Sequence, residues 1–254
     1  MTAERDEIEI RECVSVEEFD ECVRLQKLTW GYDENDTVPS RMFVVAEKIG
    51  GQIIASFAGD RMVGFCLAIP GYRNGHPYLH SHMMAVARDY QNRGVGARLK
   101  WAQRARAIDE GRRFIRWTWD PLQSRNAHFN INRLGVVVRR YAANYYGTDY
   151  STVTGKFGEQ LGLDSDRLVA EWALDSPRVE ALARGERPED LGEPSAAVEI
   201  PPNWGALVRE DADAARRELT RVREEFQRAF DAGLVCAGFE REHQRPRYLF
   251  YSDE

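Results

Sequence analysis

The spacing of apolar residues predicts strands alternating with helices through the first two-thirds of the chain. Residues 8–10 alternate like a short strand. Ser15 and Glu18 have the spacing of a capping box ahead of a helix. A turn-rich loop at residues 29–40 precedes a second helix that begins at Arg41. The apolar face expected for the first helix consists of Val16, Phe19, Val23 and Leu28.

The middle of the chain contains the clearest strand signals. Residues 52–58 and 61–69 are rich in β-forming residues and flank Gly59-Asp60, which predicts a hairpin. A loop is expected at residues 71–77, then a strand at 79–86 and a helix at 94–109 with Val95, Leu99, Ala102 and Ala105 on its apolar side. The elements expected next are a strand at 114–119, a short helix at 124–134 and a strand at 136–141.

The last third of the chain is less regular. Residues 142–166 predict a long loop, followed by a strand at 167–174. Residues 183–196 are polar, contain two prolines and read as a linker. A short strand at 197–201, a helix at 211–232 and strands at 234–241 and 247–251 follow. We therefore expect an α/β (α+β) fold with a main domain at 1–182, including the long loop, and a C-terminal extension at 183–254 that packs on the sheet or extends it.

Composition and charge exclude several classes of protein. The formal net charge of −6 gives no general electrostatic reason to bind nucleic acid. The charged first residues and the lack of a run of about 18 apolar residues argue against a signal peptide and a membrane span, so a cytoplasmic protein is expected. The scattered cysteines predict buried thiols rather than disulfides or a metal site. They are Cys13, Cys22, Cys66 and Cys236.

The segment from Gln91 to Gly96 carries the strongest chemical signal. Two glycines follow a predicted strand and open a predicted helix, where free amides and the positive helix end favour a phosphate. A dinucleotide fingerprint fails because Leu99 stands in place of its third glycine. A P-loop at Gly155-Lys156 fails because Tyr150 and Phe157 occupy its other key positions.

The segment instead resembles the Q/R-x-x-G-x-G/A loop of the GCN5-related N-acetyltransferase (GNAT) superfamily. The rhythm of Val86, Tyr90, Gly94 and Gly96 is similar, and so is the downstream segment that begins Asn126-Ala127 and ends Leu134-Gly135. The resemblance covers about residues 8–142. It implies a mixed, mainly antiparallel central sheet flanked by helices, here with a C-terminal β-α-β-β extension. The segments DPLQSRNAHFN and DRLVAEWAL resemble a longer, poorly characterised bacterial branch.

This resemblance implies acetyl-CoA or another acyl-CoA as co-substrate, with no metal. Main-chain amides from Arg93 to Arg98 would cradle the pyrophosphate. The strand edge from Met84 to Val86 would bind the pantetheine arm and polarise the thioester carbonyl. The implied cofactor-binding residues are Met84, Ala85, Val86, Gln91, Asn92, Arg93, Gly94, Val95, Gly96, Ala97, Arg98 and Asn126.

Acyl transfer to an amine also needs a base and a proton for the leaving thiolate. Strand alternation places His80 and His82 on one face, and Asp120 is a rival base. The family's general-acid tyrosine aligns with Ile131, so either a nearby tyrosine such as Tyr141 replaces it or the thiolate leaves with help from solvent.

The acceptor expected from this resemblance is the amine of a small molecule. The resemblance to the longer bacterial branch suggests an amino acid as the acceptor and a succinyl-like group as the acyl group. Arg73, Arg116 and Arg125 are candidates to bind a carboxylate. Two alternatives stay open, a non-catalytic acyl-CoA-binding regulatory protein and an interaction protein that binds no CoA. Acetylation of histones or ribosomal proteins is a weaker enzymatic alternative. For the C-terminal extension we expect one of three roles: it extends the sheet, covers the acceptor site or pairs two subunits in a homodimer.

Overall fold

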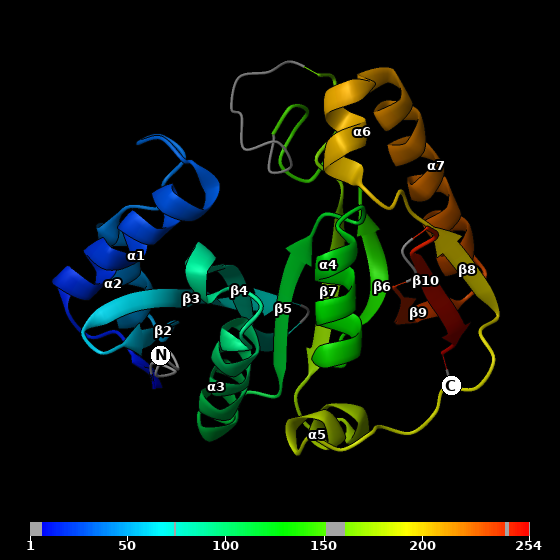
Figure 1. Cartoon of the computed structure of the whole chain (residues 1–254). Coiled ribbons are helices and arrows are strands. Elements are labelled where there is room, and N and C mark those ends of the chain that lie inside the picture. The colour runs from blue at the N-terminus through cyan, green and yellow to red at the C-terminus, as the bar shows by residue number, and fades with distance from the viewer. Residues whose placement is uncertain (1–6, 74, 151–160, 242–243, 254) are drawn as a thin grey trace, which may run out of the picture. The chain divides into compact units, whose positions relative to one another are not determined.

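The computed structural model describes residues 7–73, 75–150, 161–241 and 244–253, and it divides the chain into two compact units (Figure 1). The first unit is Met1–Ile115 and the second is Arg116–Glu254. The functional division expected near residue 182 stays a prediction. Each unit combines antiparallel strand pairs with packed helices, which confirms the expected mixed, mainly antiparallel α/β class.

The first unit is built on an antiparallel sheet in the order β1-β2-β3-β4. These strands are β1 (Ile8–Glu12), β2 (Gln52–Ala58), β3 (Arg61–Arg73) and β4 (His76–Val86). The loop expected at 71–77 is therefore wrong, because β3 and β4 stay paired through Gly71 and Tyr78. A Cβ on Gly71 would lie 2.4 Å from Cζ of Tyr78, so this glycine makes room for an aromatic ring across the ladder and does not form a turn.

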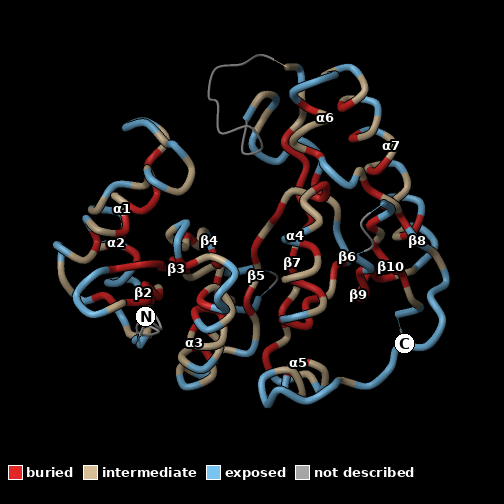
Figure 2. Tube along the Cα trace, viewed as in Figure 1, coloured by how far each residue is buried: buried red, intermediate tan, exposed pale blue. Residues whose placement is uncertain are grey.

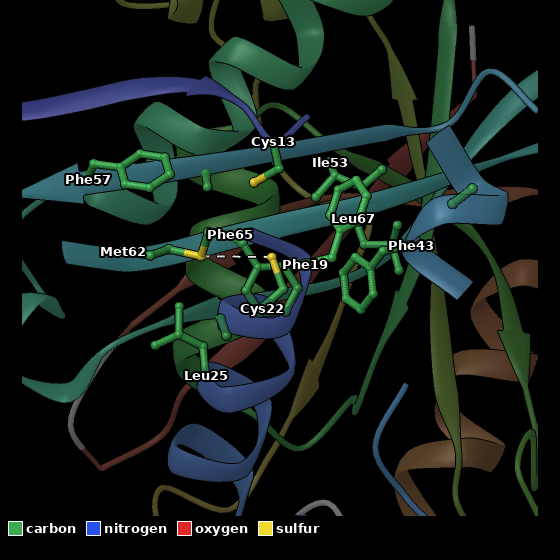
Figure 3. Packing of buried hydrophobic residues seen from close by; sticks show 13 residues of the cluster. Cys13, Phe19, Cys22, Leu25, Phe43, Ile53, Phe57, Met62, Phe65 and Leu67 are labelled. Carbon is green, nitrogen blue, oxygen red and sulfur yellow. Dashed lines mark hydrogen bonds between the residues drawn. The ribbon is translucent and has the colours of Figure 1, made fainter. Parts of the chain in front are cut away.

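Helices cover both faces of this sheet. Ile53 and Phe65 pack with α1 (Val16–Trp30) and α2 (Ser40–Lys48), as the close view of this cluster shows (Figure 3). Ile54 and Cys66, their neighbours on β2 and β3, pack instead with Val95 and Leu99 of α3 (Val95–Asp109). Successive strand residues point to opposite faces, so two short apolar strands supply two separate cores.

The capping box at Ser15 and Glu18 is confirmed, but the predicted face of α1 is partly wrong. Val16 and Leu28 are 53% and 68% exposed. The buried face instead contains Phe19, Cys22, Leu25 and Gln26. Gln26 can be buried because its side-chain amide bonds both the N–H and the C=O of Val38. Hydrogen-bonded polar side chains also occupy the buried face of α3. There Lys100 and Gln103 are buried, whereas Ala105, predicted on the apolar side, is exposed.

Lys100 is an uncommon feature of this core because its side chain is only 3% exposed. Its ammonium group donates to Oγ of Ser81 at 3.0 Å and to Oε1 of Gln103 at 2.6 Å. Burial lowers the pKa of Lys100 from 10.5 to about 7, although the neighbouring Cys66 opposes the shift. The core therefore contains an amine that titrates near neutral pH.

The second unit contains strands in the order β5-β7-β6-β9-β10-β8, with β5 (Phe114–Trp119) beginning at the boundary between the units. The pairs β7–β6, β6–β9, β9–β10 and β10–β8 are antiparallel, so the C-terminal strands extend the sheet of this unit. The other strands are β6 (Val137–Ala142), β7 (Arg167–Ala173), β8 (Ala196–Glu199), β9 (Leu234–Glu240) and β10 (Arg247–Ser252).

The helices of the second unit differ from the sequence-based expectation in two ways. The predicted helix at 124–134 begins as α4 (Ser124–Ala127) and continues as a wider π-helix, η2 (His128–Arg133). Two short helices were not expected, α5 (Pro177–Ala183) and α6 (Trp204–Glu210). The polar linker after α5 is exposed, as expected (Figure 2). Helix α7 (Ala212–Asp231) buries Leu219, Val222 and Phe226 as predicted.

A buried carboxylate fastens α7 to the end of β6. The side chain of Asp166 is fully buried and receives Nε and one terminal nitrogen of Arg223 at 2.8 and 2.7 Å. Tyr141 and the backbone N–H of Asn144 also donate to it, at 2.6 and 2.9 Å. The same arginine reaches Asp164 at 2.7 Å. Four donors satisfy one buried charge, so both ends of the segment between β6 and β7 are held against α7.

We expect Arg223→Met to lower the free energy of unfolding by about 3 kcal/mol, because it leaves the carboxylate of Asp166 buried without its counter-charge. Urea denaturation measures the change. Arg228→Met is the matched control on the same helix, since Arg228 is 67% exposed and should change stability by less than about 0.5 kcal/mol. Equal losses in the two variants would contradict this role of Arg223.

We expect the stability of the wild-type protein relative to Lys100→Met to rise as the pH increases from about 7 towards 10.5. In that window the unfolded chain keeps a proton on Lys100 that the folded chain has released, so the slope is positive and at most about 1.4 kcal/mol per pH unit. Urea denaturation of both proteins across this range measures the difference, which cancels the titration of other groups. A difference that is flat with pH would show that Lys100 stays charged when buried.

Candidate functional site

The turn between β4 and α3 is closed by hydrogen bonds that Gln91 and Ala87 make. The backbone N–H of Ala87 donates to the carbonyl of Val63 at 2.8 Å and anchors the end of β4 to β3. A 3₁₀ turn, η1 (Arg88–Tyr90), follows. Nε2 of Gln91 then reaches back to the carbonyl of Val86 at 3.0 Å. The glutamine of the motif therefore holds the loop closed, so that the next residues are presented outward.

Two residues in the left-handed region turn the chain into the helix. Asn92 has a φ of 61° and Gly94 a φ of 81°, and Asn92, Arg93 and Gly94 are exposed. Nothing lies within 4 Å of the place where a Cβ of Gly94 would be, so this glycine is required by its backbone conformation and leaves open space beside it. At Gly96 a Cβ would meet Cε of Met84 at 3.4 Å, which shows how closely α3 approaches β4.

The electrostatics of this helix start suit an anion. The N-cap residue Gly94 offers no side-chain acceptor, and the first turn of α3 contains no acidic residue. The first amides of an α-helix have no partner within the helix, and the aligned peptide dipoles add a partial positive charge. Arg93 lies beside them with its guanidinium 5.3 Å from the ring centre of Tyr90. A pyrophosphate fits this exposed, amide-rich turn.

Most of the predicted cofactor-binding residues lie in one place. Those from Met84 to Arg98 lie on the end of β4, the turn and the first turn of α3, all within the first unit. Arg98 is exposed and donates to the carbonyl of Ile8 at 2.5 Å, so its side chain also ties α3 to β1. Asn126 belongs to the second unit, where it is exposed on α4.

Strand β4 departs from regular pairing beside its two histidines. Ser81 pairs with Ala68 and Met83 with Leu67, so His82 is an extra residue without an opposite partner. Met83 packs with the core under α1 and α2, whereas Met84 packs with the core under α3. This β-bulge is not visible in the sequence, and it interrupts the ladder immediately before the strand segment expected to bind the co-substrate.

His80 and His82 remain close together, with ring centres 6.2 Å apart. His80 is half-buried, and its pKa is lowered to about 4, first by burial and then by the charges of His82 and Lys100. His82 is exposed at the surface of β4, but the surrounding protein partly desolvates its imidazole, and this lowers its pKa as well. Both imidazoles are thus neutral near pH 7 and able to accept a proton, and His82 is the more accessible of the two.

Asp120 lies directly after β5 in the second unit. Its carboxylate accepts from the backbone N–H of Leu122 at 2.9 Å and from Nε2 of Gln123 at 3.4 Å. Burial raises the pKa of Asp120, and these hydrogen bonds oppose the shift. These contacts are those of an Asp-Pro turn.

Tyr141 is engaged within the second unit, because its hydroxyl donates to Asp166. Burial raises the pKa of Tyr141 and the negative charge of Asp166 raises it further, so the phenol releases its proton less readily than a free tyrosine. Ile131, at the position of the family's tyrosine, is fully buried in η2.

Sequence reasoning missed Lys100 as a member of this neighbourhood. Its charge contributes to the lowered pKa of His80, and it donates to Ser81 between the two histidines on β4. A signal was present, since Lys100 and Gln103 interrupt the apolar stripe that Val95 and Leu99 begin. That signal alone did not single out Lys100, because its burial depends on partners distant in the sequence such as Ser81.

Among the described residues, no group of three or more His, Cys, Asp and Glu side chains is arranged to hold a metal ion. No helix in the described ranges combines the length and apolar character needed to cross a membrane. All four cysteines are buried, as expected, and each is a free thiol.

Comparison with known proteins agrees with this geometry. The sequence profile of the acetyltransferase (GNAT) family matches residues 11–134. No curated protein sequence matches the chain. Several solved structures share the fold over about two-thirds of it.

Three of them illustrate the likeness. Aminoglycoside 6'-acetyltransferase type Ii is 19% identical with a TM-score of 0.52, and the match covers 66% of this chain and 98% of that one. A GNAT-family protein from Desulfovibrio desulfuricans is 13% identical with a TM-score of 0.51, covering 66% and 99%. The ribosomal-protein-S18-alanine N-acetyltransferase from Escherichia coli is 13% identical with a TM-score of 0.50, covering 67% and 96%.

The matched segment runs from β1 to the end of η2 and includes the strand, glycine turn and helix described above. Residues 11–134 of this chain are similar to the acetyltransferase (GNAT) family over the segment that contains the candidate site.

Proposed function

We propose that this protein transfers an acyl group from acetyl-CoA or a related acyl-CoA to the amine of a small molecule. The observation that carries the proposal is the exposed start of α3, where the left-handed turn at Gly94 leaves free amides, without an acid in the first turn, inside the segment that matches the family. We assign the catalytic domain to residues 1–182 and the extension to 183–254, in a cytoplasmic protein.

In this proposal the backbone from Arg93 to Arg98 binds the pyrophosphate, and Asn126 contacts the arm of the co-substrate. The strand end from Met84 to Val86 binds the pantetheine and directs an amide at the thioester carbonyl. The bulge at His82 supports this role, because an interrupted ladder frees main-chain groups for a ligand. The acyl-CoA supplies an activated thioester, and the protein supplies binding, orientation and a route for protons.

We assign the base to His82. Its accessible, neutral imidazole takes a proton from the acceptor's ammonium group, and the free amine then attacks the thioester carbon. A C–N bond forms, the C–S bond breaks, and the thiolate leaves. His80 is the weaker candidate because a pKa of about 4 makes it a poor base. Asp120 ranks below both, since its carboxylate already accepts from Leu122 and Gln123.

We propose that the departing thiolate is protonated through solvent. Tyr141 directs its hydroxyl at Asp166 at 2.6 Å, so as a general acid it would have to leave that contact. The buried Ile131 favours a second candidate, an acyl-CoA-binding protein without turnover. Retained CoA binding without acyl transfer to any amine would identify that case.

We expect Gly94→Trp to weaken the binding of acetyl-CoA at least about tenfold, because the side chain would enter the open space beside the turn. Isothermal titration with CoA, acetyl-CoA and succinyl-CoA measures the affinity. Gly111→Trp is the matched control. It follows the same helix, has a φ of 73° and also has nothing within 4 Å of its Cβ position, so it adds similar strain and bulk elsewhere. If folded wild-type protein binds none of the three thiols and thioesters, the acyltransferase proposal fails.

We expect His82→Gln to lower kcat/KM by about 10²-fold or more once an acceptor is found, as for loss of a general base. In the wild type, activity should fall as the pH drops through the lowered pKa of His82, because protonation removes the base; the inflection should lie below about 6.5. A steady-state pH profile tests this. His76→Gln, on the exposed start of the same strand, should leave the rate and the profile unchanged. If the activity of His82→Gln falls at low pH with the same inflection as that of the wild type, His82 is not the base.

A further inference from the structure

A chain of buried polar side chains runs between α3 and the strands β3 and β4, which pack against it within the first unit (Figure 1). The ammonium group of Lys100 donates to Oγ of Ser81 on β4 at 3.0 Å. It also donates to Oε1 of Gln103 at 2.6 Å, and Nε2 of Gln103 donates in turn to Sγ of Cys66 on β3 at 3.7 Å. All four side chains are buried. The network therefore connects three elements through the core of the unit.

The two ends of this network lie on either side of the β-bulge in β4. Ser81 is the last paired residue of β4 before the bulge at His82. Cys66, at the other end of the network, lies opposite Met84, two positions beyond the extra residue. The network thus holds one strand immediately before the irregularity and its partner strand immediately after it.

The contact with Lys100 also fixes the direction of the side chains along β4. Ser81 reaches Lys100 and therefore points to the face of the sheet that α3 covers. Its neighbour His80 lies opposite Ile69, which packs with the core under α1 and α2 on the other face. The imidazole of His82 stays beside that of His80, with ring centres 6.2 Å apart. Anchoring Ser81 to α3 thus turns the two imidazoles away from α3.

The bulge sets the register of the strand end beyond it. With the bulge in place, Ala85 pairs with Phe65, and the backbone N–H of Ala87 donates to the carbonyl of Val63 at 2.8 Å. Without an extra residue, each position after His82 would move by one against β3, and each side chain would turn to the opposite face. The segment expected to bind the acyl-CoA arm would then present different main-chain groups.

A lysine is a costly residue at this place in the core. A methionine of similar length would fill the space without taking an amine out of water. Residues that break the packing rules of a core are expected beside functional sites. The charge of Lys100 acts on titratable groups of both strands, His80 on β4 and Cys66 on β3. Lys100 is therefore placed to influence the candidate site as well as the stability of the unit.

We propose that Lys100 is a positioning residue for acyl transfer: through Ser81 and Gln103 it holds the bulge of β4, and the bulge directs the imidazole of His82 and the strand end that follows. Lys100 acts through these groups and contacts no reacting atom. The catalytic consequence rests on the proposed function, whereas the structural part is tested without any substrate.

Hydrogen exchange of the full chain, followed by nuclear magnetic resonance, tests the structural part. The amide of Ala87 reports the register after the bulge, because it bonds the carbonyl of Val63. We expect Lys100→Met to speed this exchange at least about tenfold. The amide of Cys13, which bonds the carbonyl of Ile53 at 2.9 Å in the same unit, should exchange as in the wild type. Unchanged exchange at Ala87, or an equal increase at both amides, would overturn the proposal.

The titration of the two imidazoles separates positioning from an effect of charge. The protein has five histidines, and the signals lost in His80→Gln and His82→Gln identify the pair. The charge of Lys100 contributes to the lowered pKa of His80, whereas burial lowers the pKa of His82. We expect Ser81→Ala, which keeps the lysine, to raise the pKa of His82 towards 6.5, because a released bulge exposes its imidazole to water. A pKa of His82 that is the same in Ser81→Ala, Lys100→Met and the wild type would overturn the positioning role.

Steady-state kinetics test the catalytic consequence. We expect Lys100→Met and Ser81→Ala each to lower kcat about tenfold or more, and the double variant to lose little beyond that, because both changes break the same contact. Lys48→Met is the matched control, since it removes an equal charge from a side chain on α2 that is 72% exposed, and it should leave kcat unchanged.

Equal kcat in the wild type and folded Lys100→Met would contradict the positioning role. Thermal unfolding identifies a variant that fails to fold, and Ser81→Ala then decides in place of Lys100→Met. A wild-type protein that turns over no acyl-CoA with any amine contradicts the proposed function alone. In that case the exchange and titration results still decide whether Lys100 holds the bulge.

Discussion

The reversal of the chain between β4 and α3 is the constraint on which the candidate site depends. A strand paired to β3 must become a helix packed under the same sheet, and left-handed conformations at Asn92 and Gly94 accomplish the turn. The side chain of Gln91 closes the loop on the carbonyl of Val86. Because this geometry keeps bulky groups away from the helix start, the first amides of α3 are accessible, and such a backbone arrangement suits an anion.

Buried polar groups fix the packing of elements within each unit. In the first unit Lys100 reaches from α3 to Ser81 on β4, next to the two histidines. In the second, Asp166 gathers Arg223 and Tyr141 and so binds α7 to the sheet. Such groups contribute little as isolated pairs, but each is costly to separate from its partners, so it favours one arrangement of the elements over others.

The two units make different chemical contributions. The first presents an amide-rich turn and neutral imidazoles, which suit a phosphate-bearing acyl donor and the removal of a proton. The second has Arg125 and Arg241 among the residues that line a small pocket. Residues of α6 also line that pocket, so the extension adds a feature of its own beyond the family segment.

The sequence by itself determined the local features. The capping box at Ser15, the glycine turn before α3, the order of the main helices and strands through β7 and the likeness to the GNAT family follow from short-range patterns, because backbone conformation and periodicity are local properties. The tertiary structure alone decided which residues acquired unusual strand pairing, burial or hydrogen-bond partners. The bulge at His82, the burial of Lys100 and the engagement of Tyr141 with Asp166 depend on pairing register and on partners distant in sequence. Desolvation and charge depend on everything packed nearby, so the same lysine or tyrosine reads alike in sequence whether it is solvated or buried.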